Sequence, residues 1–148
     1  SWLRTHGYTA YSLGLLKKFL QLAGVDGYYE LMLPLLLTAK FLSADFDRTM
    51  SILAHMRANA ASAEGLAAQI EANLSYDLSA RAGEVRVPVL VTVGDNDVLL
   101  PPSASQEIVD AIPGAELVVF PGGAHLVTME TPAAFNDATL AWMRRNCR

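Results

Sequence analysis

Cysteine is scarce in this chain, which has one, Cys147, among 148 residues. A disulfide within the chain is therefore excluded, and stability has to come from an apolar core. The hydrophobic content of 52% is enough for such a core in one domain or two small ones. Cysteine-poor chains are typical of reducing compartments, so we expect a cytoplasmic location.

Positive charge and long apolar runs are scarce as well. Lys and Arg number 11 against 15 Asp and Glu, so the net charge is −4 and no basic surface for nucleic acid is expected. The longest apolar stretch, residues 31–37, contains Pro34 and is far shorter than the roughly 20 residues of a membrane span. The opening sequence does not have the pattern of a signal peptide. We expect neither nucleic acid nor a membrane span.

The first half of the sequence has the apolar spacing of helices. Leu13, Leu16 and Leu20 follow one another at three- and four-residue intervals, and Gly24 is expected to end that helix. The next stretch is apolar nearly all round and contains Pro34. We therefore expect a buried helix that is kinked or broken at this proline.

Two shorter helices are expected after that stretch. Phe46, Met50, Leu53 and Met56 would lie on one apolar face of the first of them, and the second repeats the same spacing. No part of this half alternates between polar and apolar residues as a half-buried strand does. We therefore expect residues 1–83 to form one helical unit.

Residues 84–148 have a different pattern. Two valine-rich stretches, 85–94 and 115–123, are expected to be strands of a parallel sheet that is covered on both faces. Two strands alone do not make a stable covered sheet. We expect further strands from a missing N-terminal part of the sheet or from a second chain.

A helix is expected after each of these strands. Ser103 and Gln106 have the spacing of a capping box at the start of the first helix, and Thr131 and Pro132 mark the start of the second. This order of elements implies parallel strands that are joined by a right-handed crossover. The sequence therefore predicts the α/β class.

One titratable residue follows each expected strand: Asp97 in the sequence GDND and His125 in PGGAH. Taken separately, they are more simply interpreted as a turn carboxylate and a structural histidine. The carboxyl ends of parallel strands, however, lie at one edge of the sheet, where ligands bind in open sheets. We expect Asp97 and His125 to lie close together there, so that the carboxylate orients the imidazole and the imidazole acts as a general base.

The segment 85–143 closely resembles the C-terminal part of α/β-hydrolase fold enzymes of the esterase and enol-lactone hydrolase type. In that family the acid follows a Gly-x-x-Asp pattern before apolar residues and proline, which here is GDND followed by VLLPP. The family's histidine follows a glycine-rich turn and precedes a Glu-x-Pro element, which here are PGGAH and METP. Ala124 stands where glycine is more usual. The resemblance implies that Asp97 and His125 are catalytic residues.

The resemblance also implies an architecture. Residues 1–83 would be a helical cap or lid, and residues 84–148 would be the C-terminal part of the α/β-hydrolase core. The chain would then have a partial α/β-hydrolase fold, in which a helical cap precedes a βαβα unit of a parallel sheet. The resemblance implies no cofactor and no metal.

The family's nucleophile motif, G-x-S-x-G, is absent from the sequence. The motif places its serine between a strand and a helix, whereas the nearest sequence, AYSLG with Ser12, has no expected strand in front of it. In the family order the serine precedes the acid and the histidine. The resemblance therefore implies a serine upstream of residue 1, and a chain that is inactive by itself.

The activity that the resemblance implies is hydrolysis of small, mostly apolar carboxylic esters or lactones. The upstream serine would attack the carbonyl, His125 would take its proton, and Asp97 would orient His125. Some of Met32, Met50 and Met56 would line an acyl pocket under the cap. Two alternatives stay open: a non-catalytic fold remnant that serves as a binding module, and a C–C hydrolase, haloperoxidase-like or dehalogenase-like enzyme of the same fold.

Four other titratable residues are interpreted structurally. Asp95 is expected to be solvated or to form a turn, and Glu130 to stabilise the start of the last helix electrostatically. His6 and His55 have no partner in the sequence and are expected on the surface or within the cap.

Overall fold

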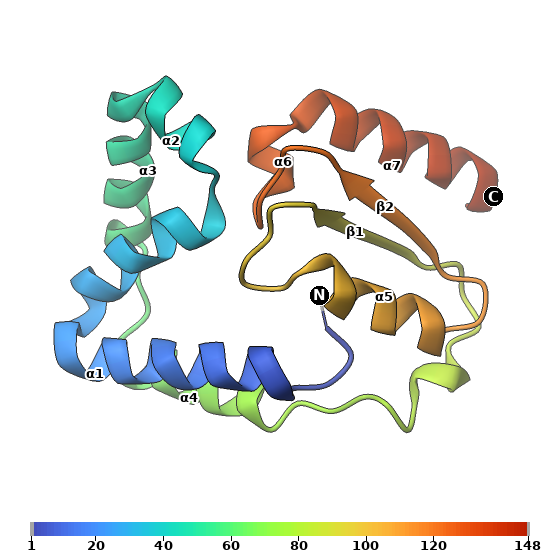
Figure 1. Ribbon diagram of the computed structural model, residues 1–148, viewed down its shortest axis with the longest axis horizontal. Coiled ribbons are helices and arrows are strands. Elements are labelled where there is room, and N and C mark those ends of the chain that lie inside the picture. Colours follow the sequence, from blue (N-terminus) through green and yellow to red (C-terminus); the bar gives the residue numbers. More distant parts are fainter. Residues whose placement is uncertain (1, 148) are drawn as a thin grey trace.

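The computed structural model describes residues 2–147. The first half contains the helices α1 (Gly7–Leu36), α2 (Ala39–Ala44), α3 (Phe46–Ala58) and α4 (Ala63–Leu74). The second half contains the short 3-10 helix η1 (Ala82–Glu84), then β1 (Leu90–Gly94), α5 (Pro102–Ala111), β2 (Glu116–Phe120), α6 (Val127–Glu130) and α7 (Pro132–Asn146). Figure 1 shows α1 to α4, here called the helical layer, beside a strand unit made of β1, β2 and α5 to α7.

Helix α1 consists of two helices that meet at Gly24. The backbone there has φ 68° and ψ −171°, a conformation that is open almost only to glycine because glycine has no Cβ. The helix that was predicted to end at Gly24 does end there, but helical turns resume at once. Pro34 lies in the last turn, and α1 ends two residues later at Leu36. Within residues 2–147, no helix combines the length and apolar character that crossing a membrane requires.

The helical layer has two small apolar cores. The first contains Leu16, Leu20, Leu66 and Ile70, and the second contains Leu33, Leu36, Leu37 and Leu53. The first core joins α1 to α4, and the second joins the end of α1 to α3. Leu99, from the loop after β1, packs against both cores. The strand unit is therefore anchored to the helical layer at the loop that carries Asp97.

The apolar face that was predicted for α3 is only partly buried. Phe46 is 67% exposed and Met50 is exposed too, whereas Thr49 and Leu53 are buried. Helix α3 packs against the end of α1 through Leu53. The prediction was wrong for Phe46 and Met50, because α1 and α2, which pack against α3, leave these two side chains exposed.

Strands β1 and β2 form a parallel two-stranded sheet, in which Leu90 lies opposite Glu116 and Gly94 lies opposite Phe120. Both strands are shorter than predicted. Strand β1 begins only after Pro88, because proline has no N–H to donate to the ladder. Helix α5 packs on both strands and α7 packs on β2, and Figure 1 shows the two helices on opposite sides of the strands. The carboxyl ends of β1 and β2 therefore lie side by side.

The start of α5 differs from the predicted capping box. The helix begins at Pro102, and no side chain caps it. Gln106 donates a hydrogen bond to Oδ1 of Asp110 at 2.8 Å instead of bonding back to Ser103. The prediction was wrong because two prolines already begin the helix: their φ angles are preset, and proline at the first turn removes a donor that would otherwise need a cap.

Helix α7 begins at Pro132 as predicted, but Thr131 does not cap it. The Thr131 hydroxyl donates instead to the carbonyl of Val127 at 3.0 Å. Leu140 and Met143, two apolar residues of α7, are 49% and 46% exposed. The face that carries them stays open because a sheet of two strands offers too little surface to cover it.

Candidate active site

Asp97 lies in a tight turn directly after β1. Its Oδ1 atom accepts hydrogen bonds from the backbone N–H groups of Leu99 and Leu100, both at 2.9 Å, and its own N–H donates to the carbonyl of Gly94 at 3.2 Å. The residue is buried. A buried carboxylate needs such donors, because burial of an unpaired charge is very costly. These bonds engage Oδ1 and leave Oδ2 for another partner.

The Oδ2 atom of Asp97 faces the imidazole of His125. Its distance to Nδ1 is 2.8 Å, and the side chains of Asp97 and His125 are 5% and 29% exposed. The predicted proximity of these two residues is therefore observed. Because an ionised carboxylate only accepts hydrogen bonds, Nδ1 carries the proton and Nε2 keeps its lone pair. His125 can thus take up a proton at Nε2 while Asp97 stabilises the charge that results.

The loops after β1 and β2 are tied together. Gly94 approaches the second loop so closely that a Cβ atom would lie 2.2 Å from the carbonyl oxygen of Gly123. The N–H of Asn96 donates to the same carbonyl at 2.9 Å, and Oδ1 of Asp95 accepts from the N–H of Gly122 at 2.8 Å. Asp95 therefore does more than form a turn, because its carboxylate links the two loops.

Glu130 lies two residues before α7 begins, near the helix start where it was expected, but its hydrogen bonds go to other partners. It is the last residue of α6, and its carboxylate accepts hydrogen bonds from Thr38 and from the N–H of Ala124. Its electrostatic effect on α7 stays a prediction, and residues 127–130 form a short helix of their own before α7. Thr38 is 92 positions away, so no local signal in the sequence points to this contact.

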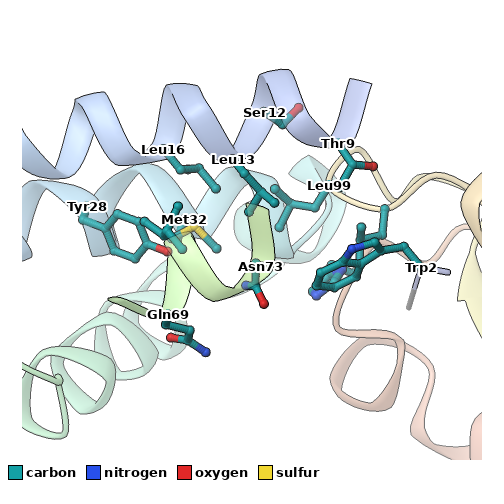
Figure 2. A pocket seen from close by; sticks show the side chains of 13 residues that line it. Trp2, Thr9, Ser12, Leu13, Leu16, Tyr28, Met32, Gln69, Asn73 and Leu99 are labelled. Atoms are coloured by element: carbon teal, nitrogen blue, oxygen red, sulfur yellow. The ribbon is translucent and has the colours of Figure 1, made fainter. Parts of the chain in front are cut away.

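A cavity of about 240 Å³ lies between the helical layer and His125. Its walls include Leu16, Met32 and Leu99, and none of the described residues that line it is Asp, Glu, Lys or Arg. Figure 2 shows Met32 near one end of the cavity and Trp2 near the other. Of the three methionines that were considered for an acyl pocket, Met32 alone is among these lining residues.

The polar lining residues that the sequence did not single out include Tyr28, Gln69 and Asn73. Gln69 and Asn73 are four positions apart on α4, so they share a face of that helix. Burial raises the pKa of the Tyr28 hydroxyl above its usual value of 10.0, and Tyr29 raises it further. Tyr28 is therefore a neutral hydrogen-bond donor at physiological pH. The four-residue spacing of the two amides was a usable signal for their shared face.

Ser12 lines the same cavity from α1. Gly7 to Ser12 are already helical, so the strand that a nucleophile motif requires does not precede it. Within residues 2–147, no hydrogen bond joins Ser12 to His125. The structure thus pairs Asp97 with His125, whereas Ser12 lines the same cavity and follows no strand within the described residues.

The other two histidines lie outside this pair. His6 contacts Glu107 at 3.1 Å, a partner that the sequence did not indicate, and His55 contacts Asn59 at 3.4 Å. Over the described part of the chain, no group of three or more His, Cys, Asp or Glu side chains could hold a metal ion.

Parallel strands that end in a paired aspartate and histidine, next to a layer of helices, define the chain as part of an α/β-hydrolase fold. The sequence profile of the family described as serine aminopeptidase, S33, matches residues 38–132, which is more than half of the chain. The chain belongs to this family.

Individual relatives agree with this assignment. A protein of Pseudomonas savastanoi pv. phaseolicola (strain 1448A / Race 6) that carries the name carbamate hydrolase RutD is 26% identical over 143 residues, which are 97% of this chain and 55% of the relative. The enol-lactonase from Burkholderia xenovorans LB400 has a TM-score of 0.74 at 26% identity, over 87% of this chain and 48% of that chain. A thermophilic esterase from Thermogutta terrifontis has a TM-score of 0.79 at 22% identity, over 100% and 54%.

These comparisons confirm the predicted resemblance and the partial α/β-hydrolase fold. The chain spans about half the length of the curated relatives that it matches.

Proposed function

We propose that this chain belongs to a hydrolase that cleaves small, uncharged and mostly apolar carboxylic esters or lactones with a Ser-Asp-His triad. The serine would come from a segment that precedes residue 1. The observation that carries the proposal is the 2.8 Å contact between Nδ1 of His125 and Oδ2 of Asp97, next to a cavity that His125 lines.

In this mechanism the serine hydroxyl attacks the carbonyl carbon while Nε2 of His125 takes its proton. The imidazolium then gives this proton to the leaving oxygen, and an acyl-serine forms. A water molecule, deprotonated by the same nitrogen, hydrolyses the acyl-serine and restores the serine hydroxyl. Asp97 stays ionised throughout and holds Nδ1–H, so that Nε2 keeps its lone pair between steps.

The substrate class follows from the lining of the cavity. None of the described lining residues carries a full charge at neutral pH apart from a protonated His125. A charged substrate group would lose its hydration there without gaining a counter-charge, which is unfavourable. An uncharged acyl or lactone ring instead contacts Leu16, Met32 and Leu99. The Burkholderia enol-lactonase supports a lactone or ester by similarity.

A carbamate is the second candidate substrate. Curated relatives carry the name carbamate hydrolase, and the amides of Gln69 and Asn73 offer acceptors for a carbamate N–H at the cavity. Comparison of kcat/KM for an ester and a carbamate with the same leaving group decides between these substrates. If Asn73→Leu lowers kcat/KM for the carbamate but not for the ester, the carbamate is favoured as the substrate.

The same proposal includes the division of the chain into a cap and a part of the core. Residues 1–83 would act as the cap and residues 84–148 as the C-terminal part of the core, and a preceding segment or a second chain would complete the sheet. A cytoplasmic location stays a prediction from the single cysteine.

The proposal is tested in the full-length protein that carries this chain. We expect His125→Ala to lower kcat/KM for p-nitrophenyl esters by at least about 10³-fold, since the general base is lost. We expect Asp97→Asn to lower it by about 10⁴-fold, because an amide N–H facing Nδ1 selects the wrong imidazole tautomer. His55→Ala, on the surface of α3, is the matched control and should keep wild-type turnover.

Labelling with a fluorophosphonate probe separates a serine hydrolase from a non-catalytic binding module. Labelling of the full-length protein, but not of residues 1–148 alone, supports a serine outside this chain. Wild-type turnover in His125→Ala would refute the triad. A full-length protein that neither turns over esters, lactones or carbamates nor reacts with the probe would instead favour the non-catalytic binding module.

A further inference from the structure

The Glu130 carboxylate joins the turn that carries His125 to the junction between α1 and α2. One oxygen, Oε1, accepts hydrogen bonds from both the N–H and the hydroxyl of Thr38, each at 2.7 Å. The other oxygen, Oε2, accepts from the N–H of Ala124 at 2.5 Å. Ala124 is buried and directly precedes His125. A single side chain therefore connects the helical layer to the backbone next to the candidate base.

A second hydrogen bond joins the same two regions. The N–H of Leu126, directly after His125, donates to the carbonyl of Leu36 at 3.0 Å. Leu36 is the last residue of α1, and Thr38 is the N-cap of α2. The N–H groups of Ala124 and Leu126, the residues on either side of His125, are thus both held by the three-residue junction 36–38, one through Glu130 and the other directly.

The chemistry of this connection requires a carboxylate. Three donors converge on two oxygens of Glu130, and an ionised carboxylate offers acceptor lone pairs at both of them. A glutamine at this position would turn an NH₂ group towards either Ala124 N–H or Thr38, and donors facing each other repel. Alanine would leave all three donors without this partner.

We infer that Glu130 is a positioning residue, which couples the position of the α1–α2 junction of the helical layer to the orientation of His125. The inference rests on the proposed function, because it matters for catalysis only if His125 is the base. When the α1–α2 junction is in place, Glu130 and Leu36 hold the turn so that Nδ1 of His125 reaches Asp97. When the junction shifts, the backbone on both sides of His125 loses its acceptors.

Kinetics of the full-length protein provide the first test. Glu130→Gln and Glu130→Ala should lower kcat by about 10- to 100-fold, because a misplacement of about 1 Å has an effect of this size, and should leave KM within about threefold. Thr38→Val should lower kcat too, whereas Thr38→Ser, which keeps the hydroxyl, should have a kcat close to that of the wild type. The Glu130→Gln and Thr38→Val effects should not multiply in the double variant, since both break one connection.

Two controls separate positioning from general stabilisation. Ser62 caps α4 as Thr38 caps α2, with its side chain accepting from the N–H of Gly65 at 3.1 Å. Ser62→Ala therefore removes a helix cap without touching the His125 turn. Glu71 pairs with Lys17 on the exposed face of the helical layer, so Glu71→Gln removes a carboxylate of similar type. Both controls should keep wild-type kcat.

A readout that does not need activity completes the test. Amide hydrogen exchange at Ala124 should accelerate in Glu130→Gln and in Glu130→Ala, while the amides of the α1–α4 core, such as Ile70, keep their protection. A uniform rise in exchange and a lower melting temperature, with kcat falling only in proportion to unfolded protein, would reduce Glu130 to a structural role and overturn the inference.

The outcomes also distinguish this inference from the proposed function. If His125→Ala abolishes turnover while Glu130→Gln keeps wild-type kcat and slow Ala124 exchange, the inference is wrong and the proposed function stands. If His125→Ala keeps turnover, the proposed function is wrong and the catalytic part of the inference falls with it.

Discussion

The two oxygens of the Asp97 carboxylate have separate partners. Oδ1 accepts from two backbone N–H groups, and Oδ2 faces Nδ1 of His125. The backbone donors hold the carboxylate in one orientation even before the imidazole is considered. An aspartate that was only a turn former would have needed the first set of bonds but not the second. This division is what makes the pair suitable for orienting a general base.

Gly94 allows the loop after β2 to reach this pair. A Cβ atom at this position would lie 2.2 Å from the carbonyl oxygen of Gly123 and 2.4 Å from that of Ala124, and backbone atoms cannot move aside as the end of a long side chain can. We expect Gly94→Ala to lower the free energy of unfolding by about 1–3 kcal/mol and to displace the His125 turn.

Chemical denaturation measures this change, and Gly83→Ala is the matched control. A Cβ atom at Gly83 would meet no atom within 4 Å, so that variant should be close to wild type. Equal stabilities for the two variants would show that the loops are not in contact at Gly94.

At the scale of elements, α1 depends on one glycine for its change of direction. Gly24 has φ 68° and ψ −171°, whereas Gly14 lies in a helical stretch of α1 with open space around it. The buried leucines of the two halves of α1 belong to different cores, Leu16 and Leu20 to one and Leu33 and Leu36 to the other.

Alanine at these two glycines should have opposite effects. Gly24→Ala should destabilise the protein by about 1–3 kcal/mol, because an L-residue is strained in that region. Gly14→Ala should stabilise it by about 0.5–1 kcal/mol, because alanine loses less backbone entropy in a helix. Melting temperatures of the two variants check the prediction, and a Gly24→Ala variant as stable as Gly14→Ala would contradict the bend at Gly24.

At the scale of the molecule, the strand unit presents apolar surface that nothing in the described chain covers. Val119 on β2 and Leu140 and Met143 on α7 are exposed, and β1 pairs with β2 alone within residues 2–147. Exposed apolar side chains on two elements that pack together are expected where another part of a protein covers them. This pattern supports the proposal that a further segment or chain completes the sheet.

Residues 1–148 alone should therefore bind the dye 8-anilinonaphthalene-1-sulfonate (ANS) more strongly than the full-length protein does. Fluorescence titration measures the difference. Leu140→Lys together with Met143→Lys should lower the dye binding of the short chain. The control is Leu22→Lys, at an exposed leucine of α1, which should not lower it to the same extent. Equal dye binding by the short chain and the full-length protein would mean that this surface stays open in both.

The local pattern of residues was sufficient for some of these features. A valine-rich stretch that ends in glycine is a strand wherever it can pair, so the positions of Asp97 and His125 just beyond two strands followed from the sequence. Parallel order followed from the helix between the strands, and the proximity of the two side chains followed from parallel order. Leucines at helical spacing likewise predicted the first helix, in which Leu16 and Leu20 are buried.

Tertiary structure alone decided the features that depend on distant partners. Which side chains of α3 are buried depended on the helices that pack against it, so Phe46 was placed wrongly. The acceptor role of Glu130 depended on Thr38, 92 positions away. Local propensities act over a few residues, whereas a hydrogen bond between distant segments exists only after the helices and strands have packed. For this reason the sequence by itself pointed to the Asp97–His125 pair. It did not point to Glu130, which holds the turn beside His125.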